Sequence, residues 1–242
     1  MRVPRSAAPG VVDATPRLSL RTPGPTDQPR SVVVVLPGGR SHSTARASRR
    51  NLAYLRMAAM AGTLRRRLDP RGAAVAVLRY RLRGWNGSAA DPVQDVRWAL
   101  DQVQTRFPGA PMVLVGHSMG GRAALWAADH PYVTGVCALA PWTPAGDPVR
   151  QLADRSVLIV HGLRDRRTSP EASHEYALRA LSAGMPVRRV ELPHAGHAML
   201  RRRRDWDALV ADFAGSMLVD QARMPARLTE PTAAPTTERR SP

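Results

Sequence analysis

The amino-acid sequence predicts an α/β fold with a mostly parallel sheet and helices on both of its faces. Three observations support this prediction: short apolar runs recur along the chain, they are apolar almost throughout, and segments of helical periodicity separate them. Strands covered on both faces show such continuous runs, whereas half-exposed strands alternate between apolar and polar residues. A regular alternation of strand and helix therefore favours the α/β class.

The predicted strands cover residues 31–37, 73–80, 111–116, 133–140, 156–162 and 187–193. Two of the helices can be traced residue by residue. One has an apolar stripe at Val93, Val96, Leu100, Val103 and Phe107, and the last has one at Trp206, Leu209, Val210, Phe213 and Met217. We expect Asp91 to cap the first of these helices, Pro108 and Gly109 to end it, and the last helix to begin at Asp205.

The chain has 242 residues, of which 43% are hydrophobic, which suffices for one domain with a buried core. We expect residues 18–220 to form this domain, with disordered ends at 1–17 and 221–242, where proline, threonine and charged residues are frequent. No apolar run approaches the roughly 18 residues of a membrane-spanning helix. The first twenty residues also lack the apolar core of a secretory leader, so we expect a cytoplasmic protein without a membrane partner.

The net charge of +17 raises the possibility of a nucleic-acid partner. All 36 basic residues are arginine and none is lysine, while alanine and proline are abundant, which indicates a compositional bias of the whole gene. Aromatic residues are few and the chain has no recognised nucleic-acid motif. A basic nucleic-acid-associated protein is therefore kept only as an alternative.

The segment Gly116-His117-Ser118-Met119-Gly120 lies between a predicted strand and an alanine-rich helical segment. In an open parallel sheet, ligands bind beyond the carboxyl ends of the strands. The glycines allow the chain to turn sharply, so we expect Ser118 in a strained conformation with its oxygen exposed and a helix N-terminus behind it. Ser118 is therefore the candidate nucleophile.

A serine hydroxyl needs a histidine base and a carboxylate that orients the histidine. Asp165 follows the strand at 156–162, and His197 follows the strand at 187–193. The order Ser, Asp, His, with each residue at the end of a strand, is the order that the nucleophile-elbow motif predicts. The alternatives are Asp147 for the acid and His194 for the base. We expect His117 and His161 to shape their loops rather than to transfer protons.

This combination of motifs resembles the α/β-hydrolase superfamily over residues 32–213. The resemblance implies an α/β-hydrolase fold and an oxyanion hole formed by the amide of Met119 and a second amide from the loop after the strand at 31–37. We favour Gly39 for the second amide, with Arg40 as the alternative; Pro37 stands where many relatives have histidine. The resemblance implies no metal and no organic cofactor.

Many members of this superfamily insert a helical lid between two late strands, but here residues 141–155 alone join the corresponding strands. We therefore expect no cap domain and a shallow, open site, with Trp142 in the wall of an acyl pocket.

The predicted function is that of a serine hydrolase which cleaves a small carboxylic ester, or a related acyl bond, through an acyl-enzyme. Thioesterase, peptidase and acyltransferase activities remain open, as do a catalytically silent binding protein and the oligomeric state. Arginines flank both ends of the predicted triad's loop region, at 164–167 and 201–204, and could attract anionic esters. Most such runs form a solvated face, which is the reading that we favour here.

Overall fold

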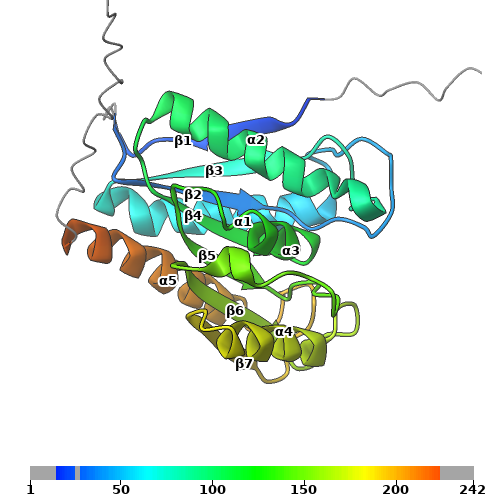
Figure 1. Cartoon of the computed structure of the whole chain (residues 1–242). Helices are drawn as coiled ribbons and strands as arrows, with labels where there is room; N and C mark the ends of the chain where they lie inside the picture. The colour runs from blue at the N-terminus through cyan, green and yellow to red at the C-terminus, as the bar shows by residue number, and fades with distance from the viewer. Residues whose placement is uncertain (1–14, 25–27, 224–242) are drawn as a thin grey trace, which may run out of the picture.

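The computed structural model describes residues 15–24 and 28–223. Within them, seven strands form one sheet in the order β1-β3-β2-β4-β5-β6-β7 (Figure 1). Strands β2 to β7 are parallel to their neighbours, and β1 pairs antiparallel with β3 at one edge. The strands are β1 (Arg17–Arg21), β2 (Ser31–Leu36), β3 (Ala73–Arg79), β4 (Met112–His117), β5 (Val133–Leu139), β6 (Ser156–Gly162) and β7 (Val187–Leu192).

Helices cover both faces of the sheet (Figure 1). They are α1 (Leu52–Leu68), α2 (Asp91–Arg106), α3 (Met119–Trp126), α4 (Pro170–Ser182) and α5 (Arg203–Arg223). Helices α1 and α5 form one apolar layer with the sheet, and α2, α3 and α4 form the layer on the other face. Every residue of β2 and β4 is buried, which explains their continuous apolar sequences. The predicted α/β architecture is confirmed.

The six predicted strands correspond to β2 through β7 and agree with them to within one residue at each end. Strand β1 was not predicted. Its sequence, Arg-Leu-Ser-Leu-Arg, has only two apolar residues, and it is held by pairing with β3, far along the chain. The expected domain limits of 18 and 220 therefore differ slightly from the first strand, which begins at Arg17, and the last helix, which reaches Arg223. The rest of the ends that we expected to be disordered, 1–14 and 224–242, lies outside the described residues.

The prediction that Asp91 caps α2 is wrong, because Asp91 is the first residue of the helix and Ala90 occupies the N-cap position. The Asp91 carboxylate instead accepts hydrogen bonds from Asn86 at 2.9 Å and from Arg81 at 3.3 Å. The preceding loop thus supplies donors that compete with the helix N-terminus. Helix α2 ends before Pro108, as expected, and α5 begins two residues before Asp205.

The connection between β5 and β6, residues 140–155, holds a single 3₁₀ turn at Arg150–Leu152 and no α-helix. The fold therefore has no cap domain, as the sequence predicts. The loops that follow the parallel strands gather at one edge of the sheet (Figure 1). The predicted site residues lie in these loops, except Met119, which is the first residue of α3. None of the described helices is both long enough and apolar enough to cross a membrane.

Candidate active site

Ser118 forms the turn between β4 and α3, with φ 55° and ψ −118°. Its N–H donates to the carbonyl of Leu139 at 2.9 Å, which fixes the turn against β5. A Cβ atom on Gly116 would lie 2.2 Å from the carbonyl oxygen of Gly120, and one on Gly120 would lie 2.4 Å from that of Leu36. Both positions therefore require glycine because backbones approach closely there. The strained conformation predicted for Ser118 is confirmed.

The Ser118 residue as a whole is only 9% exposed. The loop after β2 covers it: a Cβ atom on Gly38 would lie 3.4 Å from the Cβ atom of Ser118. The Ser118 hydroxyl makes no hydrogen bond with a described residue, and its oxygen is not one of the fully buried polar atoms that lack a partner. The oxygen is therefore accessible, as predicted, although most of the residue is covered.

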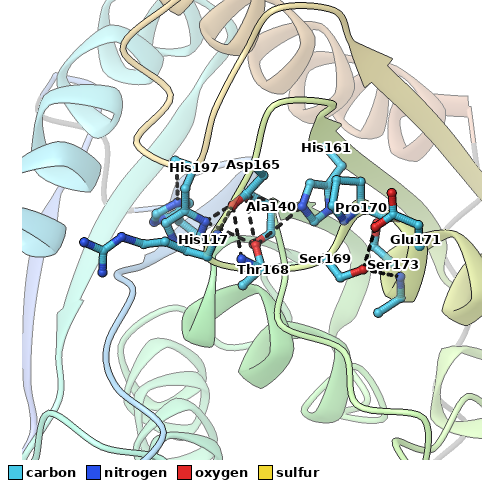
Figure 2. Close-up of polar contacts among 12 residues, drawn as sticks. His117, Ala140, His161, Asp165, Thr168, Ser169, Pro170, Glu171, Ser173 and His197 are labelled. Carbon is cyan, nitrogen blue, oxygen red and sulfur yellow. Dashed lines mark hydrogen bonds and ion pairs between the residues drawn. The ribbon is translucent and has the colours of Figure 1, made fainter.

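Asp165 and His197 meet across the loops that follow β6 and β7 (Figure 2). The distance from His197 Nδ1 to Asp165 Oδ2 is 2.8 Å, and the backbone N–H groups of Arg167 and Thr168 donate to Asp165 Oδ1 at 2.8 and 3.1 Å. Burial raises the pKa of Asp165, but hydrogen bonds from His161, from His197 and from the two amides outweigh this effect and hold the pKa well below its ordinary value. Asp165 is therefore an anion at neutral pH, oriented toward His197.

Two side chains that the sequence did not place in this site also contact Asp165 (Figure 2). Thr168 Oγ1 lies 2.9 Å from Asp165 Oδ2 and 3.1 Å from His197 Nδ1. His161 is fully buried, and its Nε2 lies 3.3 Å from Asp165 Oδ2. The sequence carried one signal for Thr168, because an aspartate in a polar loop often accepts from amides two and three residues later. His161, expected only to shape its loop, also holds the carboxylate.

His117 connects the His197 loop to the turn at Ser118. Its Nε2 lies 2.9 Å from the carbonyl oxygen of His197, and the two imidazole rings are 4.7 Å apart between centroids. Burial, with the nearby His197, lowers the pKa of His117 to about 3, so His117 is neutral at physiological pH and donates from Nε2. The described residues show no hydrogen bond between the Ser118 hydroxyl and His197. The structure thus brings Ser118, His197 and Asp165 to one place and bonds only the last two to each other.

The two alternative site residues have other roles. Asp147 is buried and accepts two hydrogen bonds from Arg122, at 2.8 and 2.6 Å, so its carboxylate is not directed at a histidine. His194 is exposed in a turn with φ 62° and has no hydrogen bond with a described residue. Across the described ranges, no three His, Cys, Asp or Glu side chains are grouped so that they could hold a metal ion.

The structure distinguishes between Gly39 and Arg40, the two candidates for the second amide of the oxyanion hole. The N–H of Arg40 donates to the carbonyl of Arg83 at 2.8 Å and is therefore engaged. The N–H groups of Gly39 and Met119 have no acceptor among the described residues. A Cβ atom on Gly39 would lie 2.4 Å from Met119 Sδ and 2.5 Å from the carbonyl oxygen of Arg83, so the Gly39 backbone packs closely against the Met119 side chain and the Arg83 backbone. The free amides are thus those of Gly39 and Met119.

Trp142 is half-buried in the loop after β5, and its backbone N–H donates to the carbonyl of Ser118 at 3.3 Å. Its ring lies 4.3 Å from the guanidinium carbon of Arg122, which also lies 3.8 Å from the ring of Trp85 and 5.6 Å from that of Trp126. Such cation–π contacts stabilise the arrangement when they are shielded from water. The sequence did not predict this cluster, which fixes Trp142 beside Ser118.

The family profile described as serine aminopeptidase, S33, matches residues 27–157. A search of curated protein sequences found no match. Among solved structures, an α/β serine hydrolase homologue from Coxiella burnetii is similar, with a TM-score of 0.63 and 17% identity, over 81% of this chain and 90% of that chain.

Two further solved structures have the same fold. A serine hydrolase without a lid from Xanthomonas campestris has a TM-score of 0.59 and 19% identity, over 84% of this chain and 89% of that chain. The esterase PE8 has a TM-score of 0.63 and 16% identity, over 85% of this chain and 99% of that chain.

Proposed function

Because the chain belongs to the serine aminopeptidase S33 family of α/β hydrolases, we propose that it is a serine hydrolase that cleaves small carboxylic esters through an acyl-enzyme intermediate. One observation carries the proposal: the strained Ser118 turn lies next to a hydrogen-bonded His197–Asp165 pair. Ser118 Oγ attacks the ester carbonyl while His197 Nε2 takes its proton, and Asp165 stabilises the imidazolium through Nδ1.

The tetrahedral intermediate places a negative charge on the former carbonyl oxygen, where the amides of Gly39 and Met119 stabilise it. His197 then gives its proton to the departing alkoxide, which leaves as an alcohol, and Ser118 keeps the acyl group. Water attacks this acyl-enzyme with His197 again acting as the base, and the acid is released. The hydrogen bond from Ser118 Oγ to His197 Nε2 forms when substrate binds, as catalytic contacts that are long in the free enzyme tighten in the complex.

The distribution of acidic residues supports an ester rather than a peptide with a free amino terminus. The site-edge parts of the loops that follow β2, β3, β5, β6 and β7 are all described (37–51, 80–90, 140–149, 163–169 and 193–202), and their only acids are Asp147 and Asp165. Asp154 lies at the other end of the β5–β6 connection, next to the start of β6. Asp147 is bonded to Arg122 and Asp165 to His197. Recognition of a substrate ammonium group needs an available carboxylate, and these loops offer none.

We expect short acyl chains to be the best substrates, with Trp142 forming one wall of the acyl pocket. The connection between β5 and β6 is too short to fold over a long chain and shield it from water. In a series of 4-nitrophenyl esters from acetate to palmitate, kcat/KM should fall as the chain lengthens. Activity should also rise smoothly through the critical micelle concentration. An abrupt rise there, or a preference for the longest chains, would contradict the proposal.

The oxyanion hole can be tested at Gly39. In Gly39→Ala the new methyl group would meet Met119 Sδ and the Arg83 carbonyl and would displace both amides, so kcat should fall by about 10²-fold to 10³-fold. Gly146→Ala is the matched control, since an added Cβ there meets nothing within 4 Å. Equal kcat values for the two variants, with intact folding shown by circular dichroism, would exclude the Gly39 amide.

A further inference from the structure

The charge of the protein is concentrated on the edge of the sheet that carries the site. The loops after β2, β3, β6 and β7 hold eleven arginines and one acid, Asp165. The helix-to-strand connections that are described in full at the opposite edge hold three arginines and three aspartates. These four loops are residues 37–51, 80–90, 163–169 and 193–202, and the loop after β5 at the same edge, 140–149, holds Asp147 and no arginine. The connections at the opposite edge are 69–72, 107–111, 127–132, 150–155 and 183–186.

Most of the arginines at the site edge have no partner within the described part of the chain. Three of them are engaged: Arg81 with Asp95, Arg49 with Ser19, and Arg202 with Asp205. The guanidinium groups of the other eight make no ion pair and no hydrogen bond with a described residue. No acidic side chain of the described residues therefore neutralises the charge of these eight arginines. Arg122, beneath the site, differs because it pairs with Asp147.

Backbone contacts hold several of these arginines beside the catalytic groups. On the oxyanion side, the Arg40 N–H donates to the Arg83 carbonyl, which itself lies against Gly39. On the histidine side, the Arg164 N–H donates to the carbonyl of Ala195 at 2.9 Å, and Arg167 donates its own N–H to Asp165 at 2.8 Å. The backbones of unpaired arginines thus border the site on two sides.

We infer that this edge selects esters that carry a negative charge close to the scissile bond, such as the half-ester of a dicarboxylic acid. The inference rests on the proposed esterase function. Backbone hydrogen bonds hold Arg40, Arg83, Arg164 and Arg167 in the loops of the site. A charge acts on a ligand over the screening length, which is about 10 Å at 0.1 M salt. Such a field raises the local concentration of anions and their rate of association.

Compositional bias alone does not explain this asymmetry. A gene that encodes arginine in place of lysine would place it at both edges of the sheet, and the last turn of α1 does carry Arg65, Arg66 and Arg67 at the opposite edge. The helix-to-strand connections there nevertheless pair three arginines with three aspartates, whereas the four loops at the site edge have eleven arginines and one acid. A solvated face, which we favoured from the sequence, would also be expected to include acids that pair with the arginines. The loops after β2, β3 and β7 contain no acid at all.

The test compares three 4-nitrophenyl esters of similar length: the glutarate half-ester, the neutral hexanoate, and an ester whose chain ends in a quaternary ammonium group. We expect kcat/KM to rank anionic above neutral above cationic. The anionic-to-neutral ratio should be about tenfold at about 0.02 M salt and should fall several-fold by about 0.3 M salt, because screening shortens the range of the field. Background hydrolysis of each ester is subtracted with the Ser118→Ala variant.

The double variant Arg40→Gln/Arg83→Gln should lower the anionic-to-neutral ratio at least threefold. Arg66→Gln/Arg67→Gln makes the same change of charge in the last turn of α1, at the opposite edge, and should leave the ratio unchanged. A ratio near one at low salt, or an equal loss in both double variants, would overturn the inference. If the anionic-to-neutral ratio is near one and heparin binds tightly at about 0.15 M salt, the arginines bind a polyanion rather than an anionic ester.

A binding measurement separates this inference from the proposed function. Calorimetry with Ser118→Ala and monoethyl glutarate measures anion recognition without turnover, and binding should weaken in the same protein carrying the Arg40 and Arg83 substitutions. If the protein hydrolyses neutral esters through Ser118 but neither prefers nor binds the anionic ester, the proposed function stands and the proposed selectivity is wrong. A protein that binds monoethyl glutarate but hydrolyses no ester keeps the selectivity and loses the function.

Discussion

Replacing Ser118 with alanine is expected to abolish ester hydrolysis, with kcat falling by about 10⁴-fold or more. The loss is large because no other group in the site can form the acyl-enzyme, and the remaining amides and binding contacts give only residual catalysis. The Ser118 hydroxyl makes no hydrogen bond with a described residue, so its removal should leave the thermal unfolding temperature nearly unchanged. Turnover of 4-nitrophenyl acetate and a thermal melt of the same preparation measure both quantities.

Ser182→Ala, at the exposed end of α4, is the matched control and should retain full activity. If Ser118→Ala hydrolyses the ester at a rate close to that of the unmodified protein, Ser118 is not the nucleophile. If Ser118→Ala is inactive because it is unfolded, its thermal melt will show this. In that case Ser118→Cys, which keeps a nucleophilic atom at position 118, serves as the second variant.

The second large effect is expected at His197. Removing its imidazole in His197→Ala takes away the base that activates Ser118, so kcat should fall by about 10³-fold to 10⁵-fold. His194→Ala, three residues earlier, should have nearly normal kcat, because His194 is exposed and bonds to no described residue. Steady-state kinetics of the two purified variants side by side make the comparison.

The reverse result, an active His197→Ala and an inactive His194→Ala, would transfer the base to His194. It would also require the loop after β7 to rearrange, since Asp165 Oδ2 lies 2.8 Å from His197 Nδ1 in the present structure. An equal loss in both variants would indicate that the loop as a whole, rather than one imidazole, supports activity.

Most of the sheet could be predicted from the sequence because its strands are buried on both faces. In β2 and β4 every residue is buried, and burial on both faces selects apolar residues at successive positions. Strand β1 has one partner strand and only partial burial, so its five residues carry no such pattern. Its existence depends on pairing with β3, a contact between distant parts of the chain that local sequence does not encode.

The candidate site was predictable where a local motif fixes a residue at the end of a strand. Ser118, Asp165 and His197 lie one, three and five residues after the ends of β4, β6 and β7, so topology brings them to one edge. The contacts of Thr168 and His161 with Asp165 depend on the conformation of the loop after β6, for which the spacing from Asp165 to Thr168 was the one local signal. The low exposure of the Ser118 residue could not be predicted because the loop that covers it follows β2, far away in the sequence.

The oxyanion donors illustrate the same limit. From the sequence we favoured Gly39 but kept its neighbour Arg40 as the alternative, and the hydrogen bond from the Arg40 N–H to the Arg83 carbonyl distinguishes the two amides. Likewise, the pairing of Asp147 with Arg122 follows from the approach of the β5–β6 connection to α3. Both choices depend on which backbone or side-chain partners meet after folding.

Labelling with a fluorophosphonate, followed by peptide mapping with mass spectrometry, tests most directly whether Ser118 is the nucleophile. The probe transfers its phosphonyl group to an activated serine with loss of fluoride. We expect one adduct per chain, on the peptide that contains Ser118, with loss of ester hydrolysis in proportion to labelling and no adduct in Ser118→Ala. An adduct on another residue, or undiminished hydrolysis by a protein fully labelled at Ser118, would contradict the assignment.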